Sequence, residues 1–221
     1  MAAMTEVALV TGGARRIGRA IVEKLADAGY AVAIHHGDSS EEAETLAAKL
    51  EASGAKTCLL SADLVDPAAV ATLIPAAEKA LGPVTLLVNN AASFVADDVR
   101  SLDIATWNRQ FSINLRAPSQ LVGIMAERLP ADAKGAVVNI VDQRVWKLTP
   151  QYYSYTLTKA ALLTATRTMA QALAPRIRVN AVGPGPTFPN SYDGADRLEQ
   201  EAAGTLLGRR IAPEEIAEAV P

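Results

Sequence analysis

Residues 7–18 read Val-Ala-Leu-Val-Thr-Gly-Gly-Ala-Arg-Arg-Ile-Gly, a short apolar run that passes directly into a turn of small residues. The apolar run predicts a buried strand, and the amphipathic stretch Arg16–Ala28 predicts a helix. In such a unit, small residues let the backbone approach a pyrophosphate, and the helix N-terminus favours its negative charge. The opening of the chain therefore predicts a dinucleotide-binding fold.

The rest of the chain repeats this alternation of short apolar runs with longer amphipathic stretches. The pattern is typical of parallel strands joined by crossover helices, so we expect a three-layer, Rossmann-like α/β fold with a doubly wound parallel sheet. Strands are predicted near Val7–Thr11, Ala31–His35, Lys56–Ala62, Thr85–Asn89, Ala136–Val141 and Ile177–Val182. Helices are predicted near Arg16–Ala28, Ser40–Ser53, Pro67–Leu81, Thr106–Leu129 and Tyr152–Leu173, with a last helix from Pro213.

Local signals refine this outline. Ser39 with Glu42 predicts a capping box, and Asp66 before Pro67 predicts an N-cap with proline at the first helical position. Residues 183–210 are rich in Gly, Pro and polar residues with little periodicity, which predicts a substrate loop. No repeat or linker interrupts the chain, so we expect residues 1–221 to form a single domain.

Composition excludes several classes of function. The chain has 221 residues, half of them apolar, and a net charge of -3, which argues against a nucleic-acid or acidic-membrane partner. No apolar run approaches the roughly 20 residues of a transmembrane helix, and we expect no signal peptide. Cys58 is the single cysteine, so a reducing, cytoplasmic location is expected. His35 and His36 have no Cys or His cluster around them, and no metal site is predicted.

Tyr155 and Lys159 are the strongest candidates for catalysis. They stand at positions i and i+4 of a predicted helix and therefore share one face. A nearby cation favours the phenolate, so the pair predicts a tyrosine pKa lowered from about 10 toward neutrality. Such a tyrosine can exchange a proton with a carbonyl or imine during hydride transfer. Neighbouring Tyr152 and Tyr153 have no basic residue at i+4.

An ordered set of motifs resembles the short-chain dehydrogenase/reductase family over essentially the whole chain. Its fingerprint Thr-Gly-x-x-x-Gly-x-Gly is matched at Thr11, Gly12 and Gly18, with Arg16 in place of the middle glycine. The other matching residues are Asp63-Leu64, Asn89-Asn90-Ala91, Asn114, Tyr155, Lys159 and the run Arg178–Gly185.

The resemblance implies roles for these residues. Asp63 would contact the adenine, Lys159 the nicotinamide ribose and Thr187 the carboxamide, while Asn114 would hold a water linking Lys159 to solvent. The implied cofactor site consists of Gly12, Arg15, Arg16, Ile17, Gly18, His35, Asp63, Leu64, Asn90, Ala91, Tyr155, Lys159, Pro184, Gly185 and Thr187.

The second predicted strand bears on the choice of cofactor. NAD-selective sites hold the ribose with an acidic residue at the end of this strand, where this chain has His35. Arg15 and Arg16 could meet a 2′-phosphate, which favours NADP(H). Asp38 nearby is counter-evidence, and we interpret it as a solvated loop acid.

One departure from the family pattern restricts the class of substrate that we expect. Asp142 stands where the general family has a catalytic serine, and an aspartate there donates a hydrogen bond only when protonated, which burial beside Tyr155 would favour. Asp142, Arg16 in the turn and Phe94 together resemble the pteridine reductase branch and the related dihydromonapterin reductases. There a phenylalanine at this position stacks on the pterin, so Arg16, Phe94, Asp142 and Tyr155 are the predicted substrate residues. Trp146, Tyr152 and Phe188 are further candidates for the pocket wall.

Three interpretations stay open. The first is an NADPH-dependent enzyme reducing the C=N bond of a pterin or dihydropterin, with Tyr155, Lys159, Asp142 and Asn114 in catalysis. The second is a general carbonyl or alcohol oxidoreductase of the same family. The third is a catalytically silent, nucleotide-sensing interaction protein.

The resemblance also bears on the chain end and on assembly. Family members continue past a helix like the one at Pro213 with a seventh strand, so we expect this sheet to lack its usual last strand and its sixth strand to form an edge. Whether the end at Pro221 is native or a tail is missing stays open. The resemblance implies a homo-oligomer, a dimer or tetramer, formed through the helices near 106–129 and 152–173.

Overall fold

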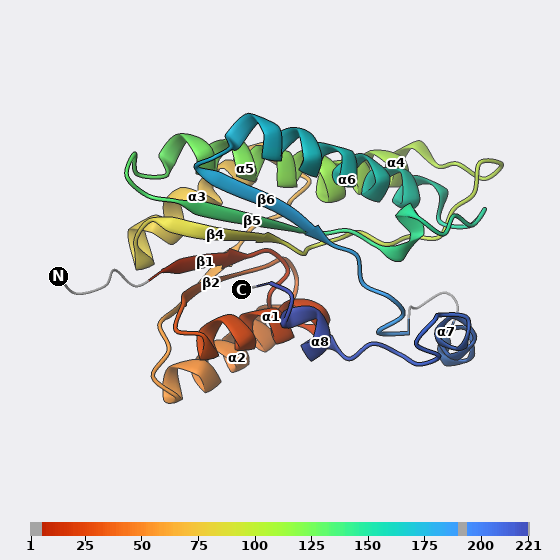
Figure 1. Cartoon of the computed structure of the whole chain (residues 1–221), viewed down its shortest axis with the longest axis horizontal. Helices are drawn as coiled ribbons and strands as arrows, with labels where there is room; N and C mark the ends of the chain where they lie inside the picture. Colours follow the sequence, from red (N-terminus) through yellow and green to blue (C-terminus); the bar gives the residue numbers. More distant parts are fainter. Residues whose placement is uncertain (1–5, 190–193, 221) are drawn as a thin grey trace.

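A computed structural model describes residues 6–189 and 194–220. Six parallel strands form one sheet in the order β3-β2-β1-β4-β5-β6 (Figure 1). The strands are β1 (Val7–Val10), β2 (Ala31–His36), β3 (Thr57–Ser61), β4 (Val84–Asn89), β5 (Gly135–Ile140) and β6 (Ile177–Val182). The expected doubly wound α/β architecture is confirmed, and the predicted strand ends differ from these by at most two residues.

Helices cover both faces of the sheet. One layer holds α1 (Arg16–Asp27), α2 (Ser40–Ala52) and α8 (Pro213–Ala217), and the other holds α3 (Pro67–Leu81), α4 (Ile104–Phe111), α5 (Ala117–Arg128) and α6 (Tyr153–Leu173) (Figure 1). Every residue of β1 is buried, with Val7 and Leu9 in the core beneath α3 and α5, and Ala8 and Val10 in the core beneath α1 and α2. A strand buried on both faces must be apolar throughout, which explains the opening run.

Two predicted segments contain elements that the sequence did not indicate. The helix predicted over Thr106–Leu129 is divided by a π-helical turn at Ser112–Arg116, a feature that is frequent at functional sites. The substrate loop predicted over 183–210 contains helix α7 (Gly194–Ala203), whose Leu198 is buried. This helix is short, begins at Gly194 and is followed by Gly204, so its periodicity is weak in the sequence. Residues 190–193 of the predicted loop lie outside the described residues.

The capping signals had different outcomes. Asp66 accepts a hydrogen bond from the Ala68 backbone N–H at 2.8 Å, as its position before Pro67 predicts. Ser39 makes no side-chain cap, and Glu42 instead pairs with Arg15 at 3.3 Å, so the predicted capping box is wrong. A tertiary ion pair has replaced a local contact.

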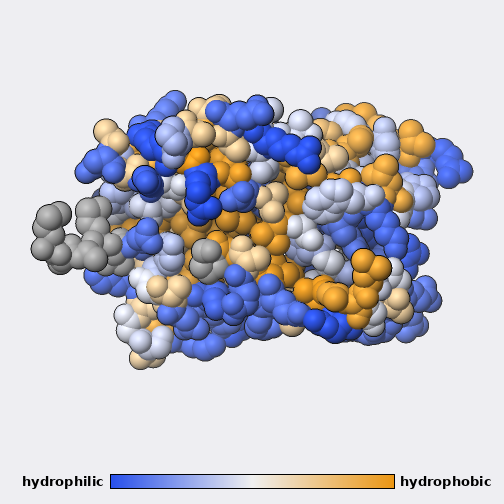
Figure 2. All heavy atoms as spheres, in the orientation of Figure 1, coloured by the Kyte–Doolittle hydropathy of each residue, from blue (hydrophilic) through white to orange (hydrophobic). Residues whose placement is uncertain are grey.

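β6 forms one edge of the described sheet, as expected. Figure 2 shows apolar residues along the middle of the visible face, between the two helical layers. Below this edge α8 packs against α1, and Lys24 pairs with Glu218 at 2.7 Å. Within the described ranges, no helix combines the length and apolarity needed to cross a membrane.

Candidate active site

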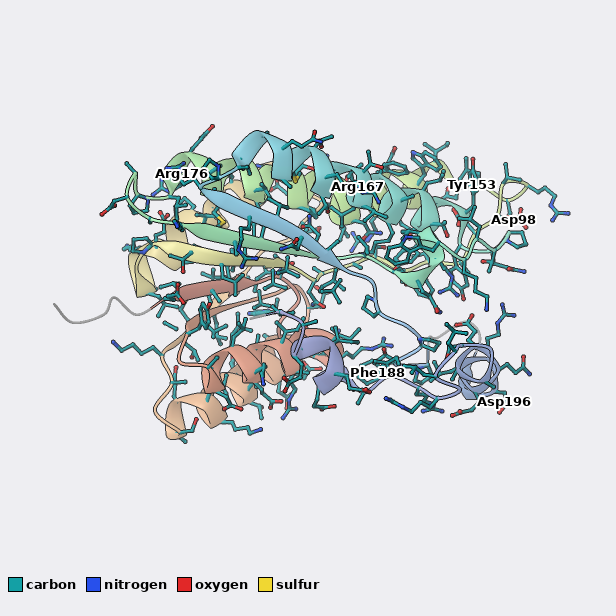
Figure 3. All side chains as sticks on the ribbon, in the orientation of Figure 1. Asp98, Tyr153, Arg167, Arg176, Phe188 and Asp196 are labelled. Atoms are coloured by element: carbon teal, nitrogen blue, oxygen red, sulfur yellow. The ribbon has the colours of Figure 1, made fainter. Side chains whose placement is uncertain are left out.

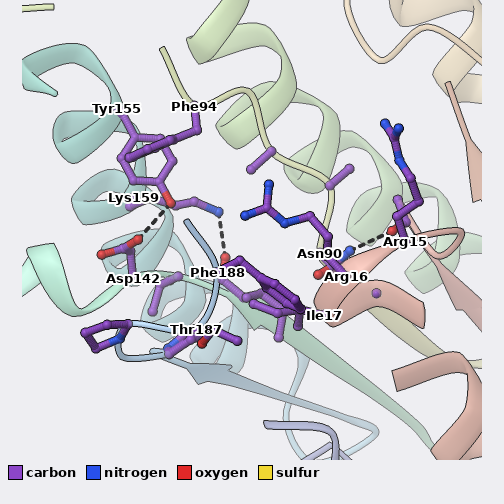
Figure 4. Close-up of a pocket in the computed structure, with 18 of the residues that line it drawn as sticks. Arg15, Arg16, Ile17, Asn90, Phe94, Asp142, Tyr155, Lys159, Thr187 and Phe188 are labelled. Carbon is purple, nitrogen blue, oxygen red and sulfur yellow. Dashed lines mark hydrogen bonds between the residues drawn. The ribbon is translucent and has the colours of Figure 1, made fainter. Parts of the chain in front are cut away.

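A cavity of about 500 Å³ opens at the carboxyl ends of the strands. This is where open α/β sheets bind ligands, and the volume is within the range of small-molecule sites. Many of the predicted site residues line it together: Gly12, Arg15, Arg16, Ile17, Gly18, Asn90, Ala91, Phe94, Asp142, Tyr155, Lys159, Pro184, Gly185 and Thr187 (Figure 4). Four others do not line it: His35, Asp63, Leu64 and Asn114.

The glycine turn is held in a form that only small residues allow. Gly12 has a φ of +63°, and a Cβ on Gly18 would lie 2.0 Å from the Gly12 carbonyl oxygen. The Asn90 side chain donates to the carbonyls of Thr11 and Gly12 at 2.8 and 3.0 Å, which locks the turn to the end of β4. Arg16 has a φ of +55°, which explains why the family fingerprint has glycine there and costs a non-glycine residue about 1 to 2 kcal/mol.

His35 supports this turn from behind. Its Nδ1 accepts from the Gly12 backbone N–H at 3.1 Å, which leaves Nε2–H to donate to the Ala62 carbonyl, also at 3.1 Å. Burial lowers the pKa of His35 to about 4, so the ring is neutral at physiological pH. The sequence placed His35 against the cofactor ribose. The structure places it beneath the turn, outside the cavity, where it satisfies a turn N–H.

Asp63 and Leu64 follow β3 and also lie outside the cavity. The Asp63 carboxylate accepts from the Val65 backbone N–H at 2.9 Å, and Leu64 is buried. Asp38 is an exposed residue of the loop after β2, as interpreted from the sequence, and it also lines the cavity together with Gly37 and Ser39.

Arg16 reaches across the cavity from the turn. Its guanidinium donates to the Pro189 carbonyl at 3.0 Å and lies 4.9 Å from the centre of the Phe188 ring. Figure 4 shows this guanidinium projecting toward Tyr155 and Lys159, and Figure 3 shows Phe188 on the segment that leads to α7. These contacts offset the backbone strain at Arg16 and bring the segment after β6 over the cavity.

Tyr155 and Lys159 project from the first turns of α6 into the cavity, and both are almost fully buried. The Tyr155 hydroxyl donates to Asp142 Oδ2 at 3.0 Å. Lys159 Nζ donates to the Ile140 carbonyl at 2.7 Å and lies 5.8 Å from the centre of the Tyr155 ring (Figure 4). The helical spacing thus brings phenol and ammonium to one face, as predicted.

The electrostatics differ from the expectation. Burial, followed by the charge and hydrogen bond of Asp142, raises the pKa of Tyr155 well above 10, and Arg144 opposes this only in part. Burial lowers the pKa of Lys159 to about 8. The predicted lowering of the tyrosine pKa was therefore wrong, because desolvation and a neighbouring carboxylate outweigh the cation. In this geometry Asp142 accepts a hydrogen bond from the Tyr155 hydroxyl, whereas the sequence predicted that Asp142 would be the donor.

Asn114 lies in the π-helical turn and is fully buried. Its Oδ1 accepts from the Ser93 backbone N–H at 2.8 Å. Its Nδ2 donates to the Ser93 carbonyl at 2.9 Å and to the Thr158 hydroxyl at 3.0 Å. These contacts tie the segment after β4 to α6, directly beside Lys159.

Phe94 belongs to an aromatic cluster at the cavity wall. Its ring stacks on Tyr152 at 4.4 Å with an interplanar angle of 11°, and meets Tyr155 edge-on at 4.6 Å. Phe188, another candidate from the sequence, also lines the cavity. Trp146 is 64% exposed and packs over Gly183 instead, where a Cβ would approach it to 2.4 Å.

Sequence reasoning missed Arg144 and Glu201. Arg144 is buried, lines the cavity and donates to Glu201 of α7 at 3.0 Å. Its position two residues after Asp142 was the available signal, because an aspartate commonly accepts from the backbone two residues on. That bond is present at 2.8 Å. The sequence around Arg144 does not indicate that its side chain pairs with Glu201, which is 57 residues away.

Comparison with known proteins gives a consistent result. The family model described as short chain dehydrogenase matches residues 6–195. A crystal structure described as FolM alternative dihydrofolate reductase 1 from Brucella canis, complexed with NADP, is 48% identical, with a TM-score of 0.94 over 98% of this chain and 86% of that one. A short-chain dehydrogenase from Burkholderia cenocepacia in complex with NADP is 31% identical, with a TM-score of 0.91 over 98% and 89% of the two chains.

A relative from Staphylococcus aureus, 3-oxoacyl-[acyl-carrier-protein] reductase FabG, is 30% identical over 90% of this chain and 81% of its own length. The fold, the glycine turn and the Tyr155–Lys159 pair agree with these matches. The chain belongs to the short-chain dehydrogenase/reductase family.

Proposed function

We propose that this oxidoreductase uses NADPH to reduce the C=N bond of a pterin or dihydropterin. The observation that carries the proposal is the hydrogen bond from Tyr155 to Asp142 beneath the Phe94 ring. A carboxylate–phenol pair at the wall offers polar contacts to ring nitrogens, and an aromatic face suits a flat heterocycle. The Brucella canis structure, described as an alternative dihydrofolate reductase, supports the same class of substrate.

The residues of the cavity fit NADP. The turn from Gly12 to Gly18 leaves no room for a side chain at Gly18, and it opens a helix whose N-terminus favours a pyrophosphate. Arg15 lines the cavity and pairs with Glu42, and we expect it to turn to a 2′-phosphate when the cofactor binds, while His35 provides no carboxylate for a free ribose hydroxyl. The two solved relatives described as NADP complexes support this choice.

The proposed chemistry divides between cofactor and protein. NADPH supplies the hydride when bound. The raised pKa of Tyr155 keeps its hydroxyl protonated at neutral pH, so Tyr155 gives its proton to the ring nitrogen. In the structure this proton is hydrogen-bonded to Asp142, which holds the hydroxyl in place, and it turns from the carboxylate to the ring nitrogen when the substrate is bound. Lys159 binds the nicotinamide ribose, and its proximity stabilises the phenolate that forms. Asn114 fastens Thr158, and thereby this turn of α6, to the segment after β4.

The test follows NADPH oxidation with dihydrobiopterin and dihydrofolate beside a panel of simple ketones. We expect turnover of a pterin, with NADH much less effective. Tyr155→Phe should lose about 100-fold or more in kcat with NADPH binding retained. Asp142→Ser should lose pterin reduction while keeping the fold. Unchanged pterin turnover in Asp142→Ser would refute the substrate assignment, and full activity of Tyr155→Phe would refute the mechanism.

A general carbonyl reductase is the second candidate, and the similarity to the 3-oxoacyl reductase of Staphylococcus aureus favours it. In that case ketones alone would turn over. A catalytically silent sensor has no need for the buried Tyr155–Asp142 contact, and turnover of any substrate excludes it.

We further propose a single-domain enzyme of the cytoplasm that assembles as a dimer or homotetramer through α4, α5 and α6. Arg167, labelled on α6 in Figure 3, is exposed. Residues 183–210, α7 included, would form the substrate loop. Sedimentation at micromolar concentration tests the assembly.

A further inference from the structure

Arg144 is a buried cation that belongs to no part of the mechanism above. It lies just after β5 in a short 3₁₀ turn, Gln143–Val145, and its side chain is only 9% exposed. A guanidinium in such a place needs anionic partners, because a buried unpaired charge is strongly destabilising. The groups that contact the guanidinium therefore indicate the role of Arg144.

Two carboxylates from different parts of the chain face this guanidinium. Glu201 of α7 accepts from Nη2 at 3.0 Å, and Asp142 Oδ1 lies 3.7 Å from Nη1. The guanidinium carbon also lies 5.6 Å from the centre of the Phe94 ring and 5.0 Å from that of Tyr152. Arg144 thus joins the end of β5, the aromatic wall and α7 at a single point.

The two oxygens of Asp142 have separate partners. Oδ2 accepts from the Tyr155 hydroxyl at 3.0 Å, while Oδ1 accepts from the Arg144 backbone N–H at 2.8 Å and faces its guanidinium. Rotation of the carboxylate toward or away from Tyr155 would therefore break a contact with Arg144. The hydrogen bond of the catalytic tyrosine depends on where Arg144 is held, and Glu201 holds Arg144.

We propose that Arg144 is a positioning residue that fastens α7 across the cavity through Glu201 and orients Asp142 beneath Tyr155. Helix α7, which would cover the substrate site, and the Tyr155–Asp142 pair are thereby joined in one ion network. Arg144 acts through Asp142 and Glu201 and exchanges no proton itself. This inference rests on the proposed proton donation by Tyr155, but not on the identity of the substrate.

Arg197 provides a matched control. It also pairs with Glu201, at 3.5 Å, but it is 40% exposed and has no contact with Asp142. Arg197→Gln removes one cation from the same carboxylate on its solvent side, where ion pairs are worth little. Arg144→Gln removes the cation that faces both carboxylates, and Arg144→Lys keeps the charge but not the planar fork that reaches both. Glu201→Gln cuts the network on the α7 side alone.

The first readout is steady-state turnover with the best substrate found, pterin or carbonyl. We expect Arg144→Gln to lower kcat at least about tenfold with little change in the NADPH KM, Arg144→Lys to recover part of it, and Arg197→Gln to match the unmodified protein. Equal effects of the Arg144 and Arg197 variants on kcat, or no recovery in Arg144→Lys, would overturn the positioning role.

The second readout needs no substrate. Hydrogen exchange of the peptide covering 196–203 should be at least about tenfold faster in Arg144→Gln and Glu201→Gln than in Arg197→Gln. Unchanged exchange would overturn the fastening of α7. Because Glu201→Gln leaves Arg144 facing Asp142, it remains informative if Arg144→Gln does not fold. If the unmodified protein does not turn over a pterin but exchange is still faster in Arg144→Gln and Glu201→Gln, the proposed substrate is wrong and the network stands.

Discussion

The free energy of unfolding should fall in acid because His35 is buried in its neutral form. The ring is 2% exposed, accepts from the Gly12 N–H and donates to the Ala62 carbonyl. Protonation would turn Nδ1 into a donor facing another donor. Burial is the main reason that the pKa of His35 falls to about 4, and the charge of His36 lowers it further.

The sign and size of the effect follow from linkage. The unfolded chain takes up this proton near pH 6.5 and the folded protein only near pH 4, so the unfolded state binds more protons between these values. The stabilisation is present above pH 6.5 and is lost as pH falls toward 4. With about 1.4 kcal/mol per pKa unit, the loss is about 2 kcal/mol by pH 5 and about 3 kcal/mol by pH 4. Lys159, with a pKa of about 8, stays protonated in both states over this window.

The assay compares the free energy of unfolding by urea for the unmodified protein and His35→Asn at pH 7, 6 and 5. The asparagine amide oxygen can still accept from the Gly12 N–H, but the side chain is too short to replace Nε2 as a donor to the Ala62 carbonyl. The variant should therefore be about 1 to 3 kcal/mol less stable at pH 7. This difference should shrink by about 2 kcal/mol at pH 5, because only the unmodified protein carries the titrating ring. Other acidic groups affect both proteins alike. Parallel stability curves would refute the reasoning.

Three further predictions concern the cofactor turn and the wall. Gly18→Ala should abolish NADPH binding by titration calorimetry, because its Cβ would lie 2.0 Å from a turn carbonyl. In contrast, Gly123→Ala, at an exposed position of α5, meets no atom within 4 Å and should raise the unfolding free energy by up to about 1 kcal/mol. Arg15→Ala should reduce the ratio of kcat/KM for NADPH over NADH about tenfold or more, and an unchanged ratio would remove Arg15 from the 2′-phosphate site. Phe94→Leu should raise the KM for a pterin more than the KM for a small ketone, since only the flat ring gains from stacking, and equal changes would contradict that role.

The parts predicted well from the sequence are those set by local chemistry. The alternation of apolar runs and amphipathic stretches indicates the order of strands and helices, because burial on a sheet or a helix face imposes its own period. The i, i+4 spacing brings Tyr155 and Lys159 to one face wherever α6 lies, and the cap at Asp66 needs only residues within one turn. The small residues from Gly12 to Gly18 predict the turn because its backbone admits little else.

What only the tertiary structure decided is the environment of those groups. The pKa of Tyr155 rises because the fold buries it and places the Asp142 carboxylate, from the end of β5, against its hydroxyl. His35 supports the turn because β1 and β2 lie side by side. Glu201 reaches Arg144 only because the fold brings α7 to the cavity wall. Desolvation and long-range charge depend on which segments meet in space, and no local pattern of residues carries that information.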